Sequence, residues 1–322
     1  MTNADAISKA LTSSDLSAGG YLNPEQSTKF IRGILDQPTL LNSCRQVIIN
    51  GENKKIEKIG FGSRILRAAT EGTALSSSDY AEPSFGKVEL STKECIAEVR
   101  ISYDTLENNI EGANLKNTIM SMIQQRVALD LEELLLNGDT TSADAYLATL
   151  NGILKKANTH VVDAAGANIG LGVFTNMINS VPGKYIRNAA EWGIYVSRNT
   201  DLAWKNQIAA RNTVAGDRFL LENANATALG FQLKPTAMMP EYSKTTGTGN
   251  EAVTTTGYTK ALFTNPKNII AGFTRRIQLE QDKDISKREH IIVVTLKVDF
   301  ALEEADAAAT VIDLKPAFTS AS

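Results

Sequence analysis

The sequence predicts an α+β fold, because one long helical segment occurs in a chain whose other ordered segments are mostly strand-like. Residues 114–136 contain no Gly or Pro, and at about 1.5 Å per residue they would form a helix of roughly 34 Å. Apolar and polar residues alternate around 88–101 and again around 289–300, as they do in half-buried strands. The 322 residues, 43% of them hydrophobic, are enough for two lobes or for one large domain with arms.

A flexible arm and a first helix are predicted at the start of the chain. Residues 1–20 are small and polar and end in Ala18-Gly19-Gly20, which is typical of a flexible arm. Asn23 can cap a helix, and Pro24 suits its first position. This region has no apolar signal-peptide core, and no apolar run approaches the roughly 18 residues of a membrane span. We therefore expect a soluble protein that is made in a cytoplasm.

Residues 51–100 predict a long two-stranded loop. Its limbs are Ile56–Phe61 and the alternating segment that contains Val88 and Leu90, while the intervening 62–82 is rich in Ser, Ala, Thr and Gly. An isolated hairpin is only marginally stable in water, so this loop should lie on the body of its own chain or on a neighbouring chain. The charged residues that we consider at its tip for contacts with another subunit are Arg64, Arg67 and Glu71.

A short helix is expected from Ser102, followed by a break near Gly112 and then by the long helix, with Gly138 as its stop. Arg126 and Asp130 are four residues apart and point to the apolar side of the long helix. They either form an ion pair at the rim of a packed face or clamp another element or subunit. Leu115, Ile119, Met122, Ile123, Leu129 and Leu134 form the apolar side, and Asn117, Ser121, Gln124, Gln125 and Glu132 the polar side.

Two acidic residues near the end of this helix oppose its dipole. Glu132 and Glu133 are adjacent, so they point about 100° apart and do not converge on one substrate. A basic partner nearby is the simplest way to relieve the unfavourable interaction with the helix dipole. Both residues are therefore candidates for contacts between subunits.

The second half of the chain mixes helices and strands. A helix cut by Pro182-Gly183 is predicted for 174–186, a strand for 192–197, a helix capped by Asn199 or Thr200 and running through 208, a strand for 230–235, a surface loop for 243–257 and a strand for 262–272. Two strands, 273–281 and 289–300, then flank a charged turn, and one more apolar strand follows. The turn is either a solvated hairpin or a contact patch between identical subunits. Its charged residues are Asp282, Lys283, Asp284, Lys287 and Arg288.

The sequence contains few of the residue patterns that catalytic, metal or nucleotide sites require. The net charge of −3 argues against a protein that depends on tight phosphate contacts. Cys44 and Cys95 are too few for a disulfide framework and suit a reducing compartment. Neither His160 nor His290 has a Cys or His at ligand spacing, no G-x-S-x-G or P-loop motif occurs, and the lone Gly170-Leu171-Gly172 is a weak nucleotide signal. We predict no catalytic, cofactor or metal site, and no enzyme.

The order of the predicted elements resembles that of the major capsid proteins of tailed bacteriophages, whose fold is named after phage HK97. An arm, a long two-stranded loop, a broken and then long helix, a mixed lobe and two late strands follow one another along almost the whole chain. Short motifs carry the resemblance within this order. They are Gly19-Gly20-Tyr21-Leu22 with Pro24; Glu71-Gly72 followed by Phe85, Val88, Leu90 and Lys93; Ile101-Ser102; Asn137-Gly138-Asp139; Gly152-Ile153; and Gly230-Phe231-Gln232-Leu233 through Met239-Pro240.

The resemblance implies an HK97-like organisation in four parts. These are an N-terminal arm with the first helix (1–50), an extended loop that reaches over a neighbouring subunit (51–100), a peripheral domain with a long spine helix (101–165 and 273–302), and a central, axial domain (166–272 and 303–322). The turn 282–288 would lie near local three-fold contacts. The spine helix is the predicted long helix of 114–136.

The resemblance also implies partners and a location. Copies of the chain would form the pentamers and hexamers of an icosahedral shell, assembled in the host bacterial cytoplasm and kept in the virion. The shell would enclose double-stranded DNA that each subunit contacts weakly and without sequence specificity. A separate scaffolding protein, a portal and a decoration protein are the other expected partners, and no membrane or cofactor is implied.

Two departures from the family pattern lead to further expectations. Some relatives carry a long N-terminal scaffolding segment, but here the motif of the first helix begins near residue 23, so we expect a separate scaffold or none. Some relatives crosslink a loop Lys to an Asn of the neighbour, but no Lys lies between Lys58 and Lys87, so we expect no covalent crosslinking. The alternatives are an encapsulin-type compartment of the same fold and, more distantly, a soluble enzyme with an unrecognised site.

Overall fold

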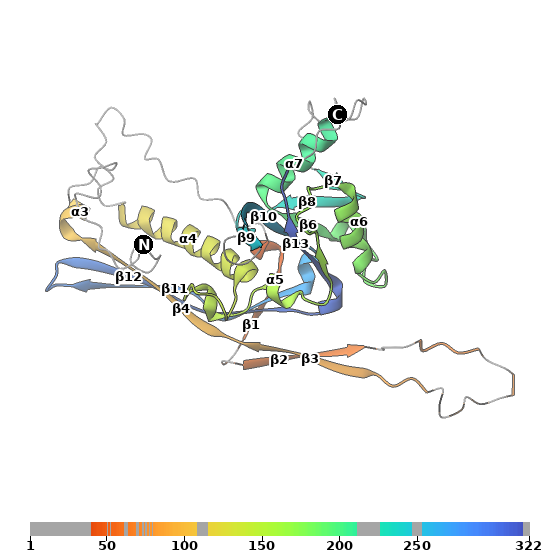
Figure 1. Ribbon diagram of the computed structural model, residues 1–322. Helices are drawn as coiled ribbons and strands as arrows, with labels where there is room; N and C mark the ends of the chain where they lie inside the picture. The colour runs from red at the N-terminus through yellow and green to blue at the C-terminus, as the bar shows by residue number, and fades with distance from the viewer. Residues whose placement is uncertain are drawn as a thin grey trace.

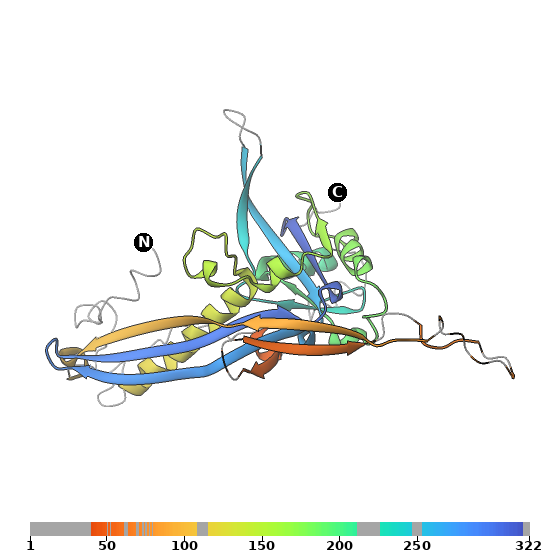
Figure 2. The ribbon, with the colours of Figure 1, turned by 90° about the horizontal axis from the view of Figure 1, so that it is seen from below.

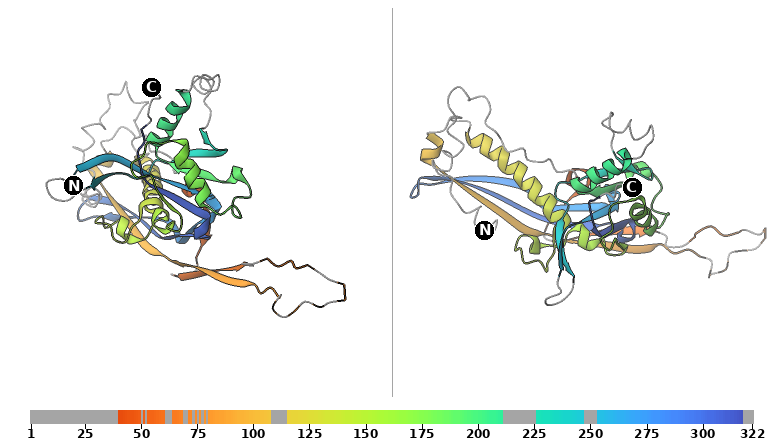
Figure 3. Two further views of the ribbon diagram at one scale, coloured as in Figure 1. Left: turned by 45° about the vertical axis from the view of Figure 1, so that its right-hand side comes forward. Right: turned by 45° about the horizontal axis from the view of Figure 1, so that its top comes forward.

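A four-stranded sheet with one long helix across it forms the elongated half of the molecule (Figure 1). This computed structural model describes residues 40–49, 51, 53–60, 64–68, 71–72, 74, 76, 78, 80–107, 115–210, 226–246 and 253–317. The predicted arm and first helix, and the predicted break near Gly112, lie outside the described residues. A second lobe stands at one end of the helix, and a two-stranded loop projects beneath it (Figures 1 and 3).

The four-stranded sheet has the order β1-β11-β12-β4 and is antiparallel except for the β1–β11 pair. Its strands are β1 (Arg45–Ile48), β4 (Lys93–Ser102), β11 (Ile269–Asp284) and β12 (Glu289–Leu302). The predicted pair of late strands is thereby confirmed. The short helix α3 (Tyr103–Glu107) follows β4, and α4 (Leu115–Asn137) packs on one face of the sheet (Figure 3).

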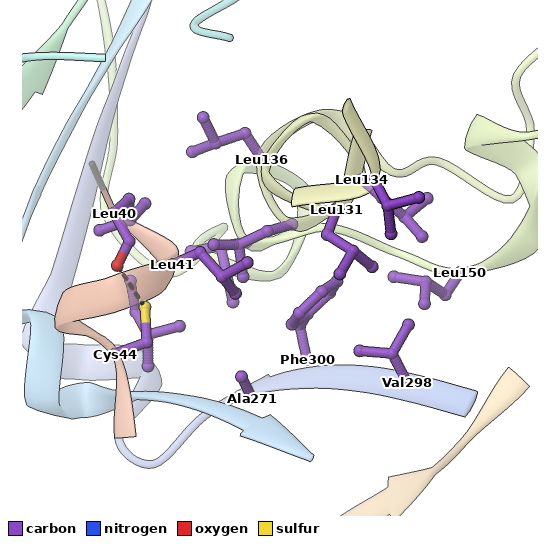
Figure 4. Close-up of a cluster of buried hydrophobic side chains, with 14 of the residues drawn as sticks. Leu40, Leu41, Cys44, Leu131, Leu134, Leu136, Leu150, Ala271, Val298 and Phe300 are labelled. Carbon is purple, nitrogen blue, oxygen red and sulfur yellow. Dashed lines mark hydrogen bonds between the residues drawn. The ribbon is translucent and has the colours of Figure 1, made fainter. Parts of the chain in front are cut away.

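The long helix α4 is amphipathic in its middle but buried on all sides near its end. Ile123 and Val127 face the sheet, whereas Leu134, Leu135 and Leu136 are all 0% exposed. Three consecutive residues span most of a helix circumference, so this end of α4 lies inside the core (Figure 4). The prediction of a polar side that continues through Glu132 is wrong for this reason, since Glu132 is 0% exposed.

Two glycines allow the chain to turn back at the end of α4. The helix ends at Asn137, and the Gly138 N–H donates to the Leu134 carbonyl at 3.0 Å. The Gly152 N–H then donates to the Gly138 carbonyl at 2.7 Å. A Cβ on Gly138 would lie 2.5 Å from the Leu150 carbonyl oxygen, so the close backbone approach requires glycine. The short helix α5 (Ile153–Lys156) follows this junction.

The second lobe is built on a sheet of order β5-β13-β10-β6-β8-β7, with β9 also paired to β10. Its core contains Trp192 and Trp204, which are 3% and 2% exposed. Helices α6 (Leu171–Ser180) and α7 (Arg198–Ala209) flank the sheet (Figure 1). The strands are β5 (Val161–Asp163), β6 (Gly193–Val196), β7 (Thr227–Ala228), β8 (Phe231–Pro235), β9 (Glu241–Thr246), β10 (Val253–Thr264) and β13 (Ala308–Leu314).

Three expectations for this lobe are corrected. Helix α6 begins at Leu171 rather than at 174, and it ends before Pro182, which lacks a backbone donor, as the predicted cut at Pro182-Gly183 requires. The Thr200 N–H donates to the Ser197 hydroxyl at 3.3 Å, so Ser197 rather than Asn199 or Thr200 caps α7. Most of the expected surface loop 243–257 belongs to the β9–β10 hairpin, which projects from the body in Figure 2.

The remaining strands, β2 (Asn53–Gly60) and β3 (Ser84–Ser91), form a separate two-stranded sheet, called here the β2–β3 loop together with the described residues of its tip. The predicted long two-stranded loop is thereby confirmed. The four-part division into domains stays a prediction. Hydrogen bonding adds that β1 and β4 join β11 and β12, although the sequence assigns most of their residues to the arm and the loop. Short 3₁₀ helices cover Leu41–Ser43, Leu147–Thr149, Ala189–Glu191, Pro266–Asn268 and Ala305–Ala307.

Candidate functional site: exposed loop and open sheet face

The two faces of the β2–β3 loop have opposite environments. Ile56 lies opposite Val88 in the strand pairing, and both pack on a small cluster formed by Ile49, Leu90, Ile270 and Ala301. Ile59 and Phe85 form the cross-strand pair on the other face, where they are 70% and 73% exposed. One face of the loop is therefore attached to the subunit, and the other presents apolar side chains to the surroundings.

The described residues at the loop tip are also exposed. Ile65 is 51% exposed and Leu66 is 85% exposed, and Arg64 and Arg67 flank them. Arg67 donates to the Arg64 carbonyl at 3.2 Å, and Glu71 is exposed in a turn nearby in the sequence. Burying a side chain such as leucine is worth about 1.5–3 kcal/mol, which the tip gains only by contacting another surface. The arrangement suits attachment to a partner that is complementary in shape and charge.

Among the described elements, the four-stranded sheet has an open face on the side opposite α4 (Figure 2). Because Cys95, Ala97 and Val99 pack toward α4, the alternate residues of β4 point away from it, and Ile96 is 67% exposed there. Among the described side chains of β4, β11 and β12, carboxylates outnumber cations on this face. The strand register places on it the acidic Glu94, Glu98, Glu280, Asp282, Asp284 and Glu289 and the basic Arg100 and Lys297.

Ion pairs between described side chains neutralise part of this acidic face. Arg100 lies 2.6 Å from Glu98 and 3.7 Å from Glu289, and Lys297 lies 3.5 Å from Glu94. The pKa of the Arg100 guanidinium is raised, first by the hydrogen bond to Glu98 and then by its charge. The described side chains of this face therefore combine an exposed isoleucine with more carboxylates than cations, which favours a basic and apolar partner.

The turn between β11 and β12 is shaped by one of its own predicted contact residues. Asp284 accepts hydrogen bonds from the Ser286 and Lys287 N–H groups at 3.0 and 3.2 Å. Hydrogen bonds, first from the Ser286 side chain, hold the pKa of Asp284 below its usual range. Asp282, Lys283, Lys287 and Arg288 are exposed beside Ile285, which is 82% exposed. A contact with another subunit at this turn stays a prediction.

The predicted pair on the long helix is an ion pair, with Arg126 Nε 2.9 Å from Asp130. Burial raises the pKa of Asp130, and the nearby guanidinium of Arg126 partly offsets this rise. Burial, and then the charge of Asp130, also raises the pKa of Glu133. Tyr146 donates to the Asp130 carbonyl at 2.7 Å. The ion-pair interpretation thus describes the contact within the subunit, and the contact with another subunit stays a prediction.

Glu132 lies inside the subunit rather than on its surface. Its carboxylate accepts a hydrogen bond from the Leu40 N–H at 2.7 Å, across 92 positions of sequence. The Leu40 carbonyl in turn accepts from the Cys44 thiol at 3.1 Å, the contact drawn in Figure 4. Burial, followed by the charge of Glu132, raises the pKa of Cys44 to about 12. Among the described residues, the Leu40 N–H group is one partner of the Glu132 carboxylate.

The described residues hold no recognisable reaction centre. No three His, Cys, Asp or Glu side chains among them come together as metal ligands would. No helix in the described part of the chain is long and apolar enough to span a membrane. His290 lies beside Tyr103 with ring centroids 5.0 Å apart, and His160 precedes β5. The notable features are surfaces, and the prediction of no catalytic, cofactor or metal site stays a prediction.

The spacing of two isoleucines on β2 is a sequence signal for exposed apolar residues on the loop. Ile56 and Ile59 are three positions apart, so they must point to opposite faces of one strand. A strand with large apolar residues on both faces, in a hairpin with little core, indicates two covering surfaces. Ile96 gave no such signal, because its exposure depends on which side of the sheet the described helix α4 covers.

Comparisons with known proteins agree on one family. The sequence model of the phage capsid family matches residues 18–312. The chain is 47% identical over 316 residues to the prophage capsid protein YqbE of Bacillus subtilis (strain 168), an alignment that covers 98% of this chain and 100% of that protein.

Solved structures share the fold at low sequence identity. The capsid of a native GTA particle matches with a TM-score of 0.63 and 18% identity, over 94% of this chain and 99% of that chain. The holo-SrpI encapsulin complex of Synechococcus elongatus PCC 7942 matches with a TM-score of 0.61 and 10% identity, over 96% of this chain and 97% of that chain. At these identities the matches establish a common HK97-like fold.

Proposed function

Because the chain belongs to the phage capsid family, we propose that its copies form the pentamers and hexamers of an icosahedral shell around double-stranded DNA. The chain is a capsid protein, and its structural relatives are shell proteins. Assembly would take place in the host cytoplasm, with a separate scaffolding protein, a portal and a decoration protein as further partners. The observation that carries this proposal is the exposed apolar face and tip of the β2–β3 loop.

The loop tip of one copy has a suitable receptor on the next. The open sheet face combines the exposed Ile96 with a surplus of carboxylates, and the tip combines Ile65 and Leu66 with two arginines. We propose that Leu66 contacts Ile96 of a second copy and that Arg64 and Arg67 lie near its Glu94 and Glu98. Opposite charges then steer the approach, and apolar burial holds the contact.

The proposed contact with DNA is weak. A net charge of −3 on 322 residues gives no overall attraction to phosphate, and DNA affinity rises with the number of Lys and Arg contacts. A closed shell confines its DNA without requiring each subunit to bind it tightly. The subunit alone should therefore show little DNA binding at physiological salt.

An encapsulin-type compartment is the second candidate, because an encapsulin shares the fold over almost the whole chain. Fold alone does not separate the two, since function depends on features added to a fold. The 47% identical relative is named a prophage capsid protein, which favours the phage shell. The more distant alternative, a soluble enzyme, has no specific observation in its favour.

Electron microscopy of purified particles tests the proposed function. If the protein forms a phage capsid, the particles should be DNA-filled shells with a tail at one vertex. Small shells filled with protein would support the encapsulin alternative, and the absence of any shells at high protein concentration would contradict both.

A crosslinking experiment tests the loop contact. Leu66→Cys combined with Ile96→Cys, in a Cys95→Ala background, should give disulfide-linked oligomers when assembled particles are run on a non-reducing gel. The matched control pairs Leu66→Cys with Leu171→Cys, which is 45% exposed on the other lobe. Monomer bands from well-formed particles of the first variant would contradict this contact without contradicting shell formation.

A further inference from the structure

Both limbs of the β2–β3 loop are attached to one short segment of the chain. On β3, the Ser91 N–H donates to Asp299 Oδ2 at 2.8 Å, although 208 positions separate the two residues. On β2, Lys58 donates to Glu304 Oε1 at 2.9 Å and also to the Glu303 carbonyl. Residues 299–304 come from the end of β12 and the turn after it, so one segment holds both limbs.

The Asp299 carboxylate has further partners besides the Ser91 N–H group. Asp299 is 7% exposed, and its Oδ1 accepts from the Phe300 N–H at 2.8 Å and lies 3.4 Å from Lys156 Nζ. Lys156 ends α5, which directly follows the Gly138–Gly152 junction at the end of α4. A buried carboxylate is retained only where charge-assisted hydrogen bonds compensate its lost hydration. Asp299 therefore joins the loop, the sheet and the region at the end of the long helix.

A second set of contacts joins both ends of the loop to Thr274 on β11. Thr92, between β3 and β4, lies with its hydroxyl 2.8 Å from the Thr274 hydroxyl, which donates to the Gly51 carbonyl at 3.0 Å. Leu90 is 1% exposed beneath them, and a Cβ on Gly272 would come within 3.1 Å of it. We call these residues the loop root. It comprises Gly51, Lys58, Leu90, Ser91, Thr92, Thr274, Asp299, Glu303 and Glu304.

We propose that Asp299 is a positioning residue that sets the direction in which the β2–β3 loop leaves the subunit. The described tip residues are exposed, so the root is where the loop's direction relative to the body is fixed. Asp299 acts there through the Ser91 N–H and through Lys156, which ties the loop to α5. This inference rests on the proposed function in one respect: the fixed direction serves to deliver the tip to a second copy.

Hydrogen exchange on unassembled full-length subunits tests the positioning role directly. Asp299→Ala should make the amides of β2 and β3 exchange about tenfold faster while those at the β11–β12 turn stay unchanged, because that turn is at the opposite end of β12 from Asp299. Asp299→Asn should give a smaller increase, since its amide oxygen still accepts from Ser91 but loses the ion pair with Lys156. Lys267→Ala, which removes the exposed pair with Glu191 in the other lobe, is the control and should change neither region.

Particle assembly supplies the second readout. Shells of Asp299→Ala should be absent or uneven in diameter, and those of Asp299→Asn intermediate. Uniform shells from Asp299→Ala, or unchanged exchange in β2 and β3, would overturn the positioning role. If Asp299→Ala does not fold, Lys58→Met with Glu304→Gln releases the other limb at a partly exposed pair and should produce the same two effects.

The two proposals fail in different ways. Wild-type protein that forms no shells would contradict the proposed function. The exchange measurement needs no assembly, so it would still decide whether Asp299 holds the loop.

Discussion

The β2–β3 loop and the core around α4 are built on opposite principles within one subunit. Leu134, Leu135 and Leu136 are 0% exposed at the end of α4, whereas Ile59 and Phe85 are 70% and 73% exposed on the loop. Apolar burial is the main stabilising contribution in the first region, and it is largely unused in the second. We infer that α4 stabilises the subunit, while the outer face of the loop gains stability only from a partner.

This difference can be tested by changing each region and measuring both subunit stability and shell formation. Changes in the core should lower the free energy of unfolding of the subunit. Changes on the loop should leave that free energy unchanged and reduce shell formation. A variant that behaves the other way would contradict the comparison.

Removal of the loop tip should have the largest effect. Deleting residues 63–78 removes Leu66, which is 85% exposed, together with both tip arginines, so shells should be lost completely while the subunit stays folded. Electron microscopy and urea-induced unfolding of the subunit measure the two effects. Normal particles from this deletion would contradict the proposed role of the tip.

Leu135→Ala should cause the largest loss of subunit stability. This side chain is 0% exposed in the main core, and a Leu→Ala change at such a position lowers the free energy of unfolding by about 3 kcal/mol, because it leaves a cavity. Leu66→Ala is the matched control, and it should change the subunit by less than about 0.5 kcal/mol. Equal losses from both variants in urea unfolding would show that the two regions do not differ as described.

Gly138→Ala should lower the free energy of unfolding by about 2 kcal/mol, because the added Cβ would lie 2.5 Å from the Leu150 carbonyl oxygen and force the backbone apart. Gly172→Ala is the control, since nothing lies within 4 Å of its added Cβ and Ala favours helix α6 by up to about 1 kcal/mol. The two substitutions should therefore have opposite signs in thermal unfolding.

Arg126→Met should change the subunit by less than about 1 kcal/mol, because the Arg126 side chain is 51% exposed and exposed ion pairs contribute little. Shell yield distinguishes the two interpretations of this pair. Normal shells support an ion pair within the subunit, whereas a loss of shells with unchanged subunit stability would support a clamp between subunits.

Particles boiled in SDS should contain no covalently crosslinked subunits. No Lys lies between Lys58 and Lys87, so the loop tip has no amine for a crosslink to a neighbour. Single-chain bands are expected on the gel. A ladder of higher bands from wild-type particles would contradict this prediction.

Patterning predicted some of these features and missed others for identifiable reasons. The alternation around Val88 and Leu90 predicted β3, and the run without Gly or Pro predicted α4 with Gly138 after it. The β9–β10 hairpin was missed because its Thr- and Gly-rich strands resemble a surface loop. This hairpin is held by tertiary contacts instead: Tyr242 donates to Asp313 at 2.6 Å, and Lys244 pairs with the same carboxylate.

The amino-acid pattern alone was enough to predict the length of the long helix, the two limbs of the extended loop and the pair of late strands, because these follow from periodicities of neighbouring residues. Only the tertiary structure decided that Glu132 is buried against Leu40, that Asp299 holds Ser91 and that Ile96 lies on an open face. These contacts join residues far apart in the chain, or depend on which face of a sheet a helix covers. Local spacing carries no information about either.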